Sequence, residues 1–196
     1  VNSGTDAIKL SLKTLGVGVG DEVITAANTF VATVGAITEI GAIPVFVDCD
    51  DTFCMNVEHL EKKINKKTKA IVPVHFTGYM TDMPKLLKIS KKYKIPIVED
   101  ACQSILASIN NKNSGTWGDF GAFSLHPLKN INVWSDGGII TTNNFKYYNK
   151  LLLLRNHGLT DRDTVKICGY NSRLDTFQAV VGNWLLPSAK SIANKR

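Results

Sequence analysis

The 196-residue sequence lacks the features that would assign it to a membrane, a secretory route or a metal site. No apolar run approaches the ~20 residues of a membrane-spanning helix, and no signal-peptide pattern opens the chain. The four cysteines form no C-x-x-C pair and show no metal-like spacing with the four histidines, so we expect free thiols and no metal. These absences favour a cytoplasmic protein without membrane partners.

Positive charge is in excess, with a formal net charge of +6 at pH 7. The basic residues fall mostly in amphipathic stretches such as 61–63 and 88–94, without aromatic residues between them. This pattern is typical of a solvated helix face, so we expect no nucleic-acid partner. An anionic substrate would also be served by positive charge, and the charge alone therefore selects no function.

Both ends of the chain look cut. The sequence begins at Val1 without an initiator Met, and it stops at Lys195-Arg196 inside or just after a helical pattern. The sequence contains no internal repeat and no low-complexity linker. We therefore interpret residues 1–196 as one large domain of a longer protein, truncated at both ends.

Short β-branched runs alternate with amphipathic helical stretches, which predicts an α/β fold with a mostly parallel sheet. The predicted strands are residues 22–25, 43–47, 70–75, 95–100, 122–125 and 138–142. The first helix carries Ile8, Leu12 and Leu15 on one face and stops at Gly16. The other predicted helices are residues 29–41, 57–64, 82–93, 144–154 and a last one from residue 174 onward.

Polar residues gather where the predicted strands end, which is where open α/β sheets bind ligands. His75 ends one strand, Asp100 ends another, and residues 124–129 follow a third. Taken singly, Asp100 could equally cap a helix, and Lys129 would normally face solvent. Taken together, they indicate a carbonyl site: a lysine in a desolvated site can form imines, and an aspartate can hold a pyridine nitrogen protonated.

The turn at residues 1–6 leads into the first helix. Free backbone N–H groups at a helix N-terminus suit a phosphate. Simple capping by Ser3 or Thr5 explains the same residues equally well.

Seven short motifs occur along the chain in an order that is typical of one protein family. They are Ser3-Gly4-Thr5-Asp6-Ala7, Thr29-Phe30-Val31-Ala32-Thr33, His75-Phe76-Thr77-Gly78, Glu99-Asp100-Ala101-Cys102-Gln103, Phe123-Ser124-Leu125-His126-Pro127-Leu128-Lys129, Arg155-Asn156-His157-Gly158 and Gly169-Tyr170-Asn171-Ser172-Arg173-Leu174. With these motifs the chain resembles, from end to end, the DegT/DnrJ/EryC1/StrS family of sugar aminotransferases. The resemblance implies the fold-type-I architecture, a three-layer α/β/α large domain that binds pyridoxal 5′-phosphate (PLP).

The resemblance also implies the groups that act on the PLP ring. Lys129 would form the Schiff base with PLP and move a proton between the substrate carbon and the cofactor. Asp100 would pair with the pyridinium nitrogen, Gln103 would contact the O3′ hydroxyl, and Phe30 would stack on the ring.

The phosphate would be held by a second set of residues. Gly4, Thr5 and Ser124 would bind it from the same chain, and Asn171 would reach it from the other subunit of a homodimer. His75 and His126 lie near these segments, and for His126 a loop-stabilising role is as well supported as a place in the site.

Members of this family transfer an amino group, usually from glutamate, to a ketone of a nucleotide-linked deoxysugar. The main alternative within the family is a PLP- or PMP-dependent sugar dehydratase, in which histidine replaces the Schiff-base lysine. The presence of Lys129 favours the aminotransferase. An alternative of another class is a non-catalytic binding or regulatory protein. One mild departure is Ser135, at a turn position where the family pattern has Gly or Glu.

Overall fold

The computed structural model describes residues 1–195. The helices are α1 (Gly4–Thr14), α2 (Val31–Thr38), α3 (Val57–Leu60), α4 (Met83–Tyr93), α5 (Phe145–Leu154), α6 (Thr176–Leu185) and α7 (Ala189–Asn194), with 3-10 turns at Glu61–Lys63, Phe76–Gly78 and Leu186–Ser188. The strands are β1 (Glu22–Ala26), β2 (Ile43–Val47), β3 (Thr68–Val72), β4 (Val98–Asp100), β5 (Ser108–Ile109), β6 (Lys112–Asn113), β7 (Phe120–Ser124) and β8 (Gly138–Thr141). No helix within this part of the chain is both long and apolar enough to cross a membrane.

Six strands form the middle of the molecule, in the spatial order β2-β1-β3-β4-β7-β8. Strand β1 pairs in parallel with β2 and β3, and β4 pairs in parallel with β7. Parallel bridges at Ile71–Ile97 and Val74–Asp100 join the two halves. Of these six strands, only β8 runs antiparallel to its neighbour. The carboxyl ends of five parallel strands therefore meet at one edge of the sheet.

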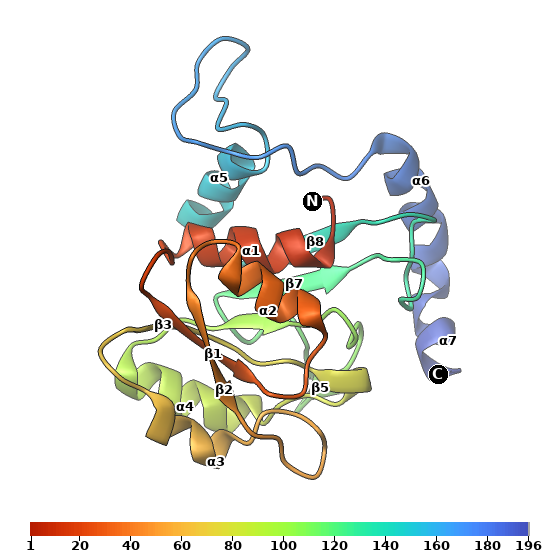
Figure 1. The fold of residues 1–196 in the computed structure, drawn as a ribbon. Coiled ribbons are helices and arrows are strands. Elements are labelled where there is room, and N and C mark those ends of the chain that lie inside the picture. The colour runs from red at the N-terminus through yellow and green to blue at the C-terminus, as the bar shows by residue number, and fades with distance from the viewer. Residues whose placement is uncertain (196) are drawn as a thin grey trace.

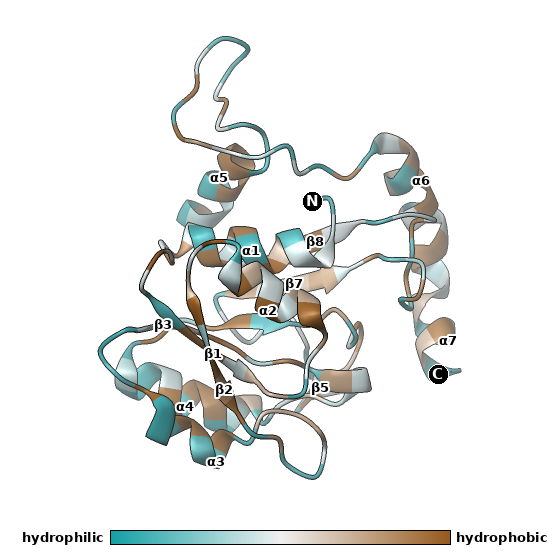
Figure 2. Cartoon of the chain, in the orientation of Figure 1, coloured by the Kyte–Doolittle hydropathy of each residue, from teal (hydrophilic) through white to brown (hydrophobic). Residues whose placement is uncertain are grey.

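Helices cover both faces of this sheet, as Figure 1 shows: α1, α2 and α5 lie on one face, and α3 and α4 on the other. Side chains alternate along each strand, so Val23 packs with the α1 helix while Ile24 packs with α4. Strands β1 and β2 are accordingly hydrophobic along most of their length in Figure 2. The result is a three-layer α/β/α arrangement with one apolar cluster on each face.

Local sequence sets the helix ends. Asp82 caps α4 by accepting a hydrogen bond from the Lys85 amide at 3.0 Å, and Pro84 occupies the first turn. Gly16 follows α1 with φ of 82°, a conformation that glycine adopts without strain. Asp175 and Gln178 form a reciprocal capping box at the start of α6.

The observed helices and strands match the predicted ones, but two strands end before or begin after a proline that lies within the predicted range. Predicted strand 70–75 ends at Val72 because Pro73 has no amide hydrogen for the ladder, and predicted strand 95–100 starts only after Pro96 for the same reason. Predicted helix 57–64 divides into α3 and a 3-10 turn. The β5–β6 hairpin was not predicted; its two-residue turn is Asn110-Asn111, both with positive φ.

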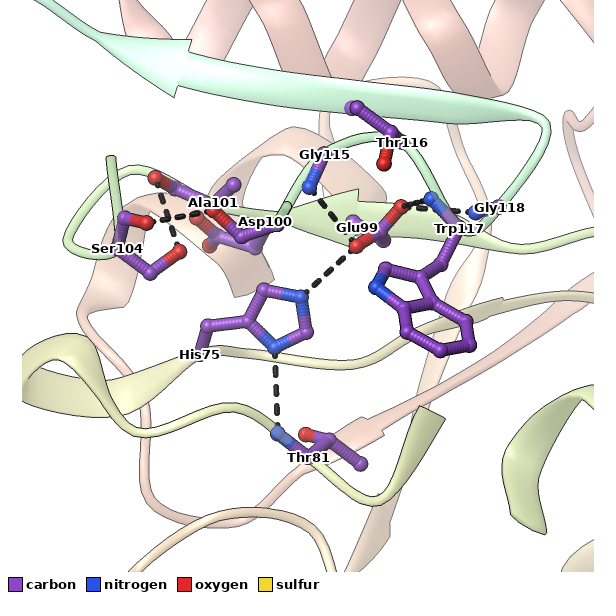
Figure 3. Close-up of polar contacts among 12 residues, drawn as sticks. His75, Thr81, Glu99, Asp100, Ala101, Ser104, Gly115, Thr116, Trp117 and Gly118 are labelled. Atoms are coloured by element: carbon purple, nitrogen blue, oxygen red, sulfur yellow. Dashed lines mark hydrogen bonds and ion pairs between the residues drawn. The ribbon is translucent and has the colours of Figure 1, made fainter. Parts of the chain in front are cut away.

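Glu99 holds the carboxyl end of β4 in place. Its side chain is fully buried and accepts four hydrogen bonds: from the amides of Gly115, Trp117 and Gly118, and from Nε2 of the buried His75 at 3.0 Å (Figure 3). The other ring nitrogen of His75 accepts a hydrogen bond from the Thr81 amide at 3.3 Å. Since Nδ1 is an acceptor, Nε2 carries the ring proton and donates to Glu99.

The N-terminal turn packs directly on the start of β8. The Val1 backbone nitrogen donates to the Gly138 carbonyl, and the Gly138 amide donates to the Val1 carbonyl, both at 3.0 Å. A Cβ atom on Gly138 would overlap the carbonyl group of Ser3. Only glycine permits this approach, which brings the start of α1 to the edge where the parallel strands end.

We predict that Gly138→Ala destabilises the protein by about 1–3 kcal/mol, because the added methyl group must push the N-terminal turn away from β8. Urea denaturation measures the change. Gly18→Ala is the matched control, since a Cβ there meets no atom within 4 Å. Equal stability of the two variants would show that the turn does not depend on this contact.

We predict that Glu99→Gln lowers the free energy of unfolding by about 1.5–3 kcal/mol. The amide group would point an N–H donor at backbone amides that need an acceptor. Glu58→Gln is the control, because Glu58 is exposed and its ion pair with Lys85 lies at the surface. Thermal unfolding of both variants measures the difference, and a Glu99 variant as stable as the control contradicts the prediction.

Candidate functional site

A pocket of about 320 Å³ opens at the edge where the parallel strands end. Its walls come from the start of α1, the start of α2, the ends of β4 and β7, and the loop after β7. The predicted site residues that line it are Gly4, Thr5, Phe30, His75, Asp100, Gln103, Ser124, His126 and Lys129. Asn171 is the one predicted residue outside it.

Asp100 is the buried acid of the pocket. It is the last residue of β4, and its side chain points to the α2 face of the sheet, opposite to Glu99. Oδ1 accepts a hydrogen bond from the Cys102 amide at 3.1 Å, and Oδ2 accepts one from the Thr33 hydroxyl at 2.7 Å. Both oxygens act as acceptors, as in an ionised carboxylate.

Lys129 lies on a short loop that its own hydrogen bonds hold together. The Lys129 amide donates to the His126 carbonyl at 2.8 Å, and the His126 amide donates to Ser124 Oγ at 3.3 Å. The Lys129 side chain is half-buried, and its amine makes no hydrogen bond or ion pair with any residue in the range 1–195. It is thus a basic group that faces the pocket without a fixed partner.

The two histidines differ in what they do in the structure. Nδ1 of His126 accepts a hydrogen bond from the Leu128 amide at 3.2 Å, so this ring stabilises the loop and also lines the pocket. His75 touches the pocket wall, but both of its ring nitrogens are engaged by Glu99 and Thr81. Neither nitrogen of His75 is available to a ligand.

Gly4 lets the start of α1 close one end of the pocket. A Cβ at Gly4 would lie 2.7 Å from Cys102 Sγ and 2.8 Å from Ser124 Cβ. Ser3 caps the helix, its Oγ accepting a hydrogen bond from the Asp6 amide at 3.1 Å. The remaining first-turn amides and the Ser124 hydroxyl therefore sit together, which suits an anion.

Phe30 and Gln103 line the pocket from different parts of the chain. Phe30 is the residue before α2 and is largely exposed, so its ring is available for stacking. Gln103 Oε1 accepts a hydrogen bond from the Thr77 amide at 3.1 Å, which ties it to the loop after β3.

Asn171 is exposed and belongs to a segment that is fastened to the start of α1. The Asn2 side-chain amide donates to the Asn171 carbonyl at 2.9 Å, and the Ser172 hydroxyl donates to Asp6 Oδ2. Asp6 also binds Lys9 at 2.8 Å. Burial opposes the charge on Lys9, but its hydrogen bonds to Asp6 and Glu39 outweigh this and raise its pKa.

Five polar residues that the sequence analysis did not assign to the site also line the pocket: Ser3, Thr29, Thr33, Cys102 and Asp136. Thr29 and Thr33 stand four apart, so the predicted helix 29–41 would place both hydroxyls on one face. In the structure Thr29 precedes α2, and the two hydroxyls still lie 2.6 Å apart. Cys102 lies beside Asp100, and burial followed by the Asp100 charge raises the pKa of its thiol well above the usual range. The thiol is therefore protonated at neutral pH.

A larger cavity of about 840 Å³ adjoins this pocket and shares Cys102, Gln103, Ser124 and Lys129 with it. No group of three His, Cys, Asp or Glu side chains within residues 1–195 is placed to hold a metal ion. The pocket thus offers an acid, an amine, an aromatic face and an anion-binding helix start. This set suits a flat, anionic carbonyl compound.

Comparison with known proteins supports this assignment. The sequence profile of the DegT/DnrJ/EryC1/StrS aminotransferase family matches residues 1–196. The chain is 45% identical over 180 residues to a UDP-N-acetyl-3-dehydro-alpha-D-glucosamine 3-aminotransferase from Acidithiobacillus ferrooxidans, covering 91% of this chain and 49% of the relative. It is 44% identical over 180 residues to a pleiotropic regulatory protein from Geobacillus stearothermophilus, covering 91% of this chain and 48% of that relative.

A solved structure shows the same fold. NtdA from Bacillus subtilis with bound cofactor PMP superimposes with a TM-score of 0.90 at 36% identity, over 98% of this chain and 44% of that one. This confirms the predicted three-layer fold as that of fold-type-I aminotransferases. The chain spans about half the length of the curated relatives it matches. From the profile match and these likenesses, the chain belongs to the DegT/DnrJ/EryC1/StrS aminotransferase family.

Proposed function

We propose that residues 1–196 form the cofactor-binding large domain of a PLP-dependent aminotransferase. Its reaction would move an amino group from an amino acid, glutamate in the first instance, to a keto group of a nucleotide-linked deoxysugar. The observation that carries this proposal is the meeting of Asp100, Lys129 and the start of α1 in one pocket. The relative from A. ferrooxidans, named as an aminotransferase of a UDP-linked sugar, supports the substrate class.

The residues of the pocket fit PLP group by group. The buried Asp100 carboxylate would face the ring nitrogen, and the half-buried Lys129 amine would face the aldehyde. Gly4, Thr5 and Ser124 would hold the phosphate at the helix start. Phe30 would stack on the ring, and Gln103 would approach the O3′ hydroxyl.

PLP, when bound, supplies an electron sink for the carbon from which a proton is removed. Lys129 would accept that proton on Nζ and return it at the neighbouring position, so one amine serves both halves of the reaction. Asp100 would keep the ring nitrogen protonated. Thr5 and Ser124 would fix the phosphate, and this would orient the ring toward Lys129.

The proposal includes a homodimer in a cytoplasmic setting. Asn171 lies outside its own chain's pocket, on an exposed segment tied to the start of α1. From there it would reach the phosphate held by the partner subunit. The free thiols of Cys54 and Cys102 suit a reducing compartment.

A regulatory role is the second candidate, because the relative from G. stearothermophilus is named a pleiotropic regulatory protein. Such a protein would bind the cofactor or sugar without turnover. Adding glutamate to the PLP-loaded protein separates the two. An aminotransferase would lose its visible absorbance when glutamate is added, whereas a non-catalytic protein would keep it.

We predict that the full-length protein gains a visible absorbance band with PLP and that borohydride bleaches it, because Lys129 would hold PLP by a bond that borohydride reduces. Lys129→Ala should abolish the band. Lys112→Ala, on the β5–β6 hairpin and outside the pocket, is the matched control and should keep it. A wild-type protein without the band removes the enzyme proposal, and a band that persists in Lys129→Ala means that another lysine bonds the cofactor.

We predict that subunits carrying Asn171→Ala and subunits carrying Lys129→Ala complement each other. Each homodimer lacks one component in both of its sites and should have little aminotransferase activity. In a mixed dimer one site combines an intact Lys129 with an intact Asn171, so activity should return on mixing and subunit exchange. If mixing restores nothing although mixed dimers form, Asn171 does not act across the interface.

A further inference from the structure

Asp100 is the end of a chain of hydroxyl groups that begins at Thr29, two residues before α2, and passes through Thr33 in the first turn of α2. The Thr33 hydroxyl lies 2.7 Å from Asp100 Oδ2, and the Thr29 hydroxyl lies 2.6 Å from the Thr33 hydroxyl. Thr33 is 1% exposed, so water cannot take the place of its hydroxyl. The Asp100–Thr33 contact bridges 67 positions of sequence and joins helix α2 to strand β4.

The direction of each proton in this chain follows from the acceptor at its end. An ionised carboxylate only accepts, so Thr33 must donate its proton to Asp100. The Thr33 oxygen is then left as the acceptor, and Thr29 must donate to it. The hydroxyls are therefore ordered from Thr29 to Thr33 to Asp100, and neighbouring hydrogen bonds of this kind strengthen one another.

Thr33 behaves differently from another threonine on the same helix. Thr38 turns its hydroxyl back to the carbonyls of Val34 and Gly35, which is the usual arrangement for threonine in a helix. Thr33 turns its hydroxyl out of the helix to Asp100. The branched side chain has few rotamers in a helix, so the donated hydrogen bond holds the carboxylate at a fixed angle.

We infer that Thr33 is a positioning residue that aims the Asp100 carboxylate at the ring nitrogen of the cofactor, with Thr29 holding Thr33. This inference rests on the proposed cofactor function. Oδ1 is held by the Cys102 amide and Oδ2 by Thr33, and each oxygen keeps a lone pair for the protonated ring nitrogen. Phe30 is the N-cap residue directly before α2, so one helix start positions both the proposed ring-stacking group and the acid.

The test compares the binding of two compounds to the full-length protein: PLP, and an analogue with carbon in place of the pyridine nitrogen. We expect Thr33→Val to weaken PLP binding roughly tenfold, because a charge-assisted hydrogen bond to Asp100 is lost. Binding of the analogue should not change, since it has no ring nitrogen for Asp100. Thr33→Ser, which keeps the hydroxyl, should restore most of the PLP affinity, and Thr38→Val is the matched control on the same helix.

The outcomes separate this inference from the proposed function. If wild-type protein does not bind PLP, the proposed function fails. If wild-type protein binds PLP and Thr33→Val binds it equally well, or loses both compounds equally, Thr33 does not act through the ring nitrogen. If Thr33→Val does not fold, the less buried Thr29→Val decides: a loss for PLP alone, smaller than tenfold, supports the inference, and no loss or an equal loss for both compounds overturns it.

Discussion

Two adjacent carboxylates are buried at the end of one central strand, and the site depends on how each is satisfied. Glu99 and Asp100 have at most 6% of their surface exposed. A buried charge without partners is very costly, so each must find hydrogen-bond donors on its own face of the sheet. Glu99 takes three loop amides and a histidine, whereas Asp100 takes one amide and one hydroxyl. Glu99, which accepts four hydrogen bonds, fixes the end of the strand. Asp100 accepts two and so keeps lone pairs for a ligand.

The backbone around the pocket is shaped by small residues at points of close approach. Gly4 admits the start of α1 beside Cys102 and Ser124, and Gly138 admits the turn before it against β8. These contacts bring backbone amides to the same edge as Asp100 and Lys129. The pocket can therefore bind an anion through the amides at the start of α1 and a cationic group through the Asp100 carboxylate.

The fold was largely predictable from sequence because its signals are local. Alternating strand and helix patterns predicted the α/β class, and Asp82 with Pro84 marked the start of α4 correctly. Asp100 and Lys129 were expected at one edge of the sheet, because both follow the carboxyl ends of parallel strands, where open α/β sheets bind ligands. The hydrogen-bond partners of Asp100 could not be predicted from the sequence, because Thr33 and Asp100 are 67 positions apart. His75 shows the same limit: its position at a strand end suggested a site residue, but its ring is committed to Glu99 on the other face.

The fastening of the N-terminal turn to residues 171–173 has a consequence for how the chain reaches its final state. Asn2 donates to the Ser172 hydroxyl and to the Asn171 carbonyl across about 170 residues of sequence. Contacts of such separation close the largest loops in the chain and are among the slowest to form. During synthesis, Asn2 leaves the ribosome long before residues 171–173 do. The fastening of the turn that leads into α1 therefore waits for residues 171–173, whereas the contact of Gly4 with Ser124 does not.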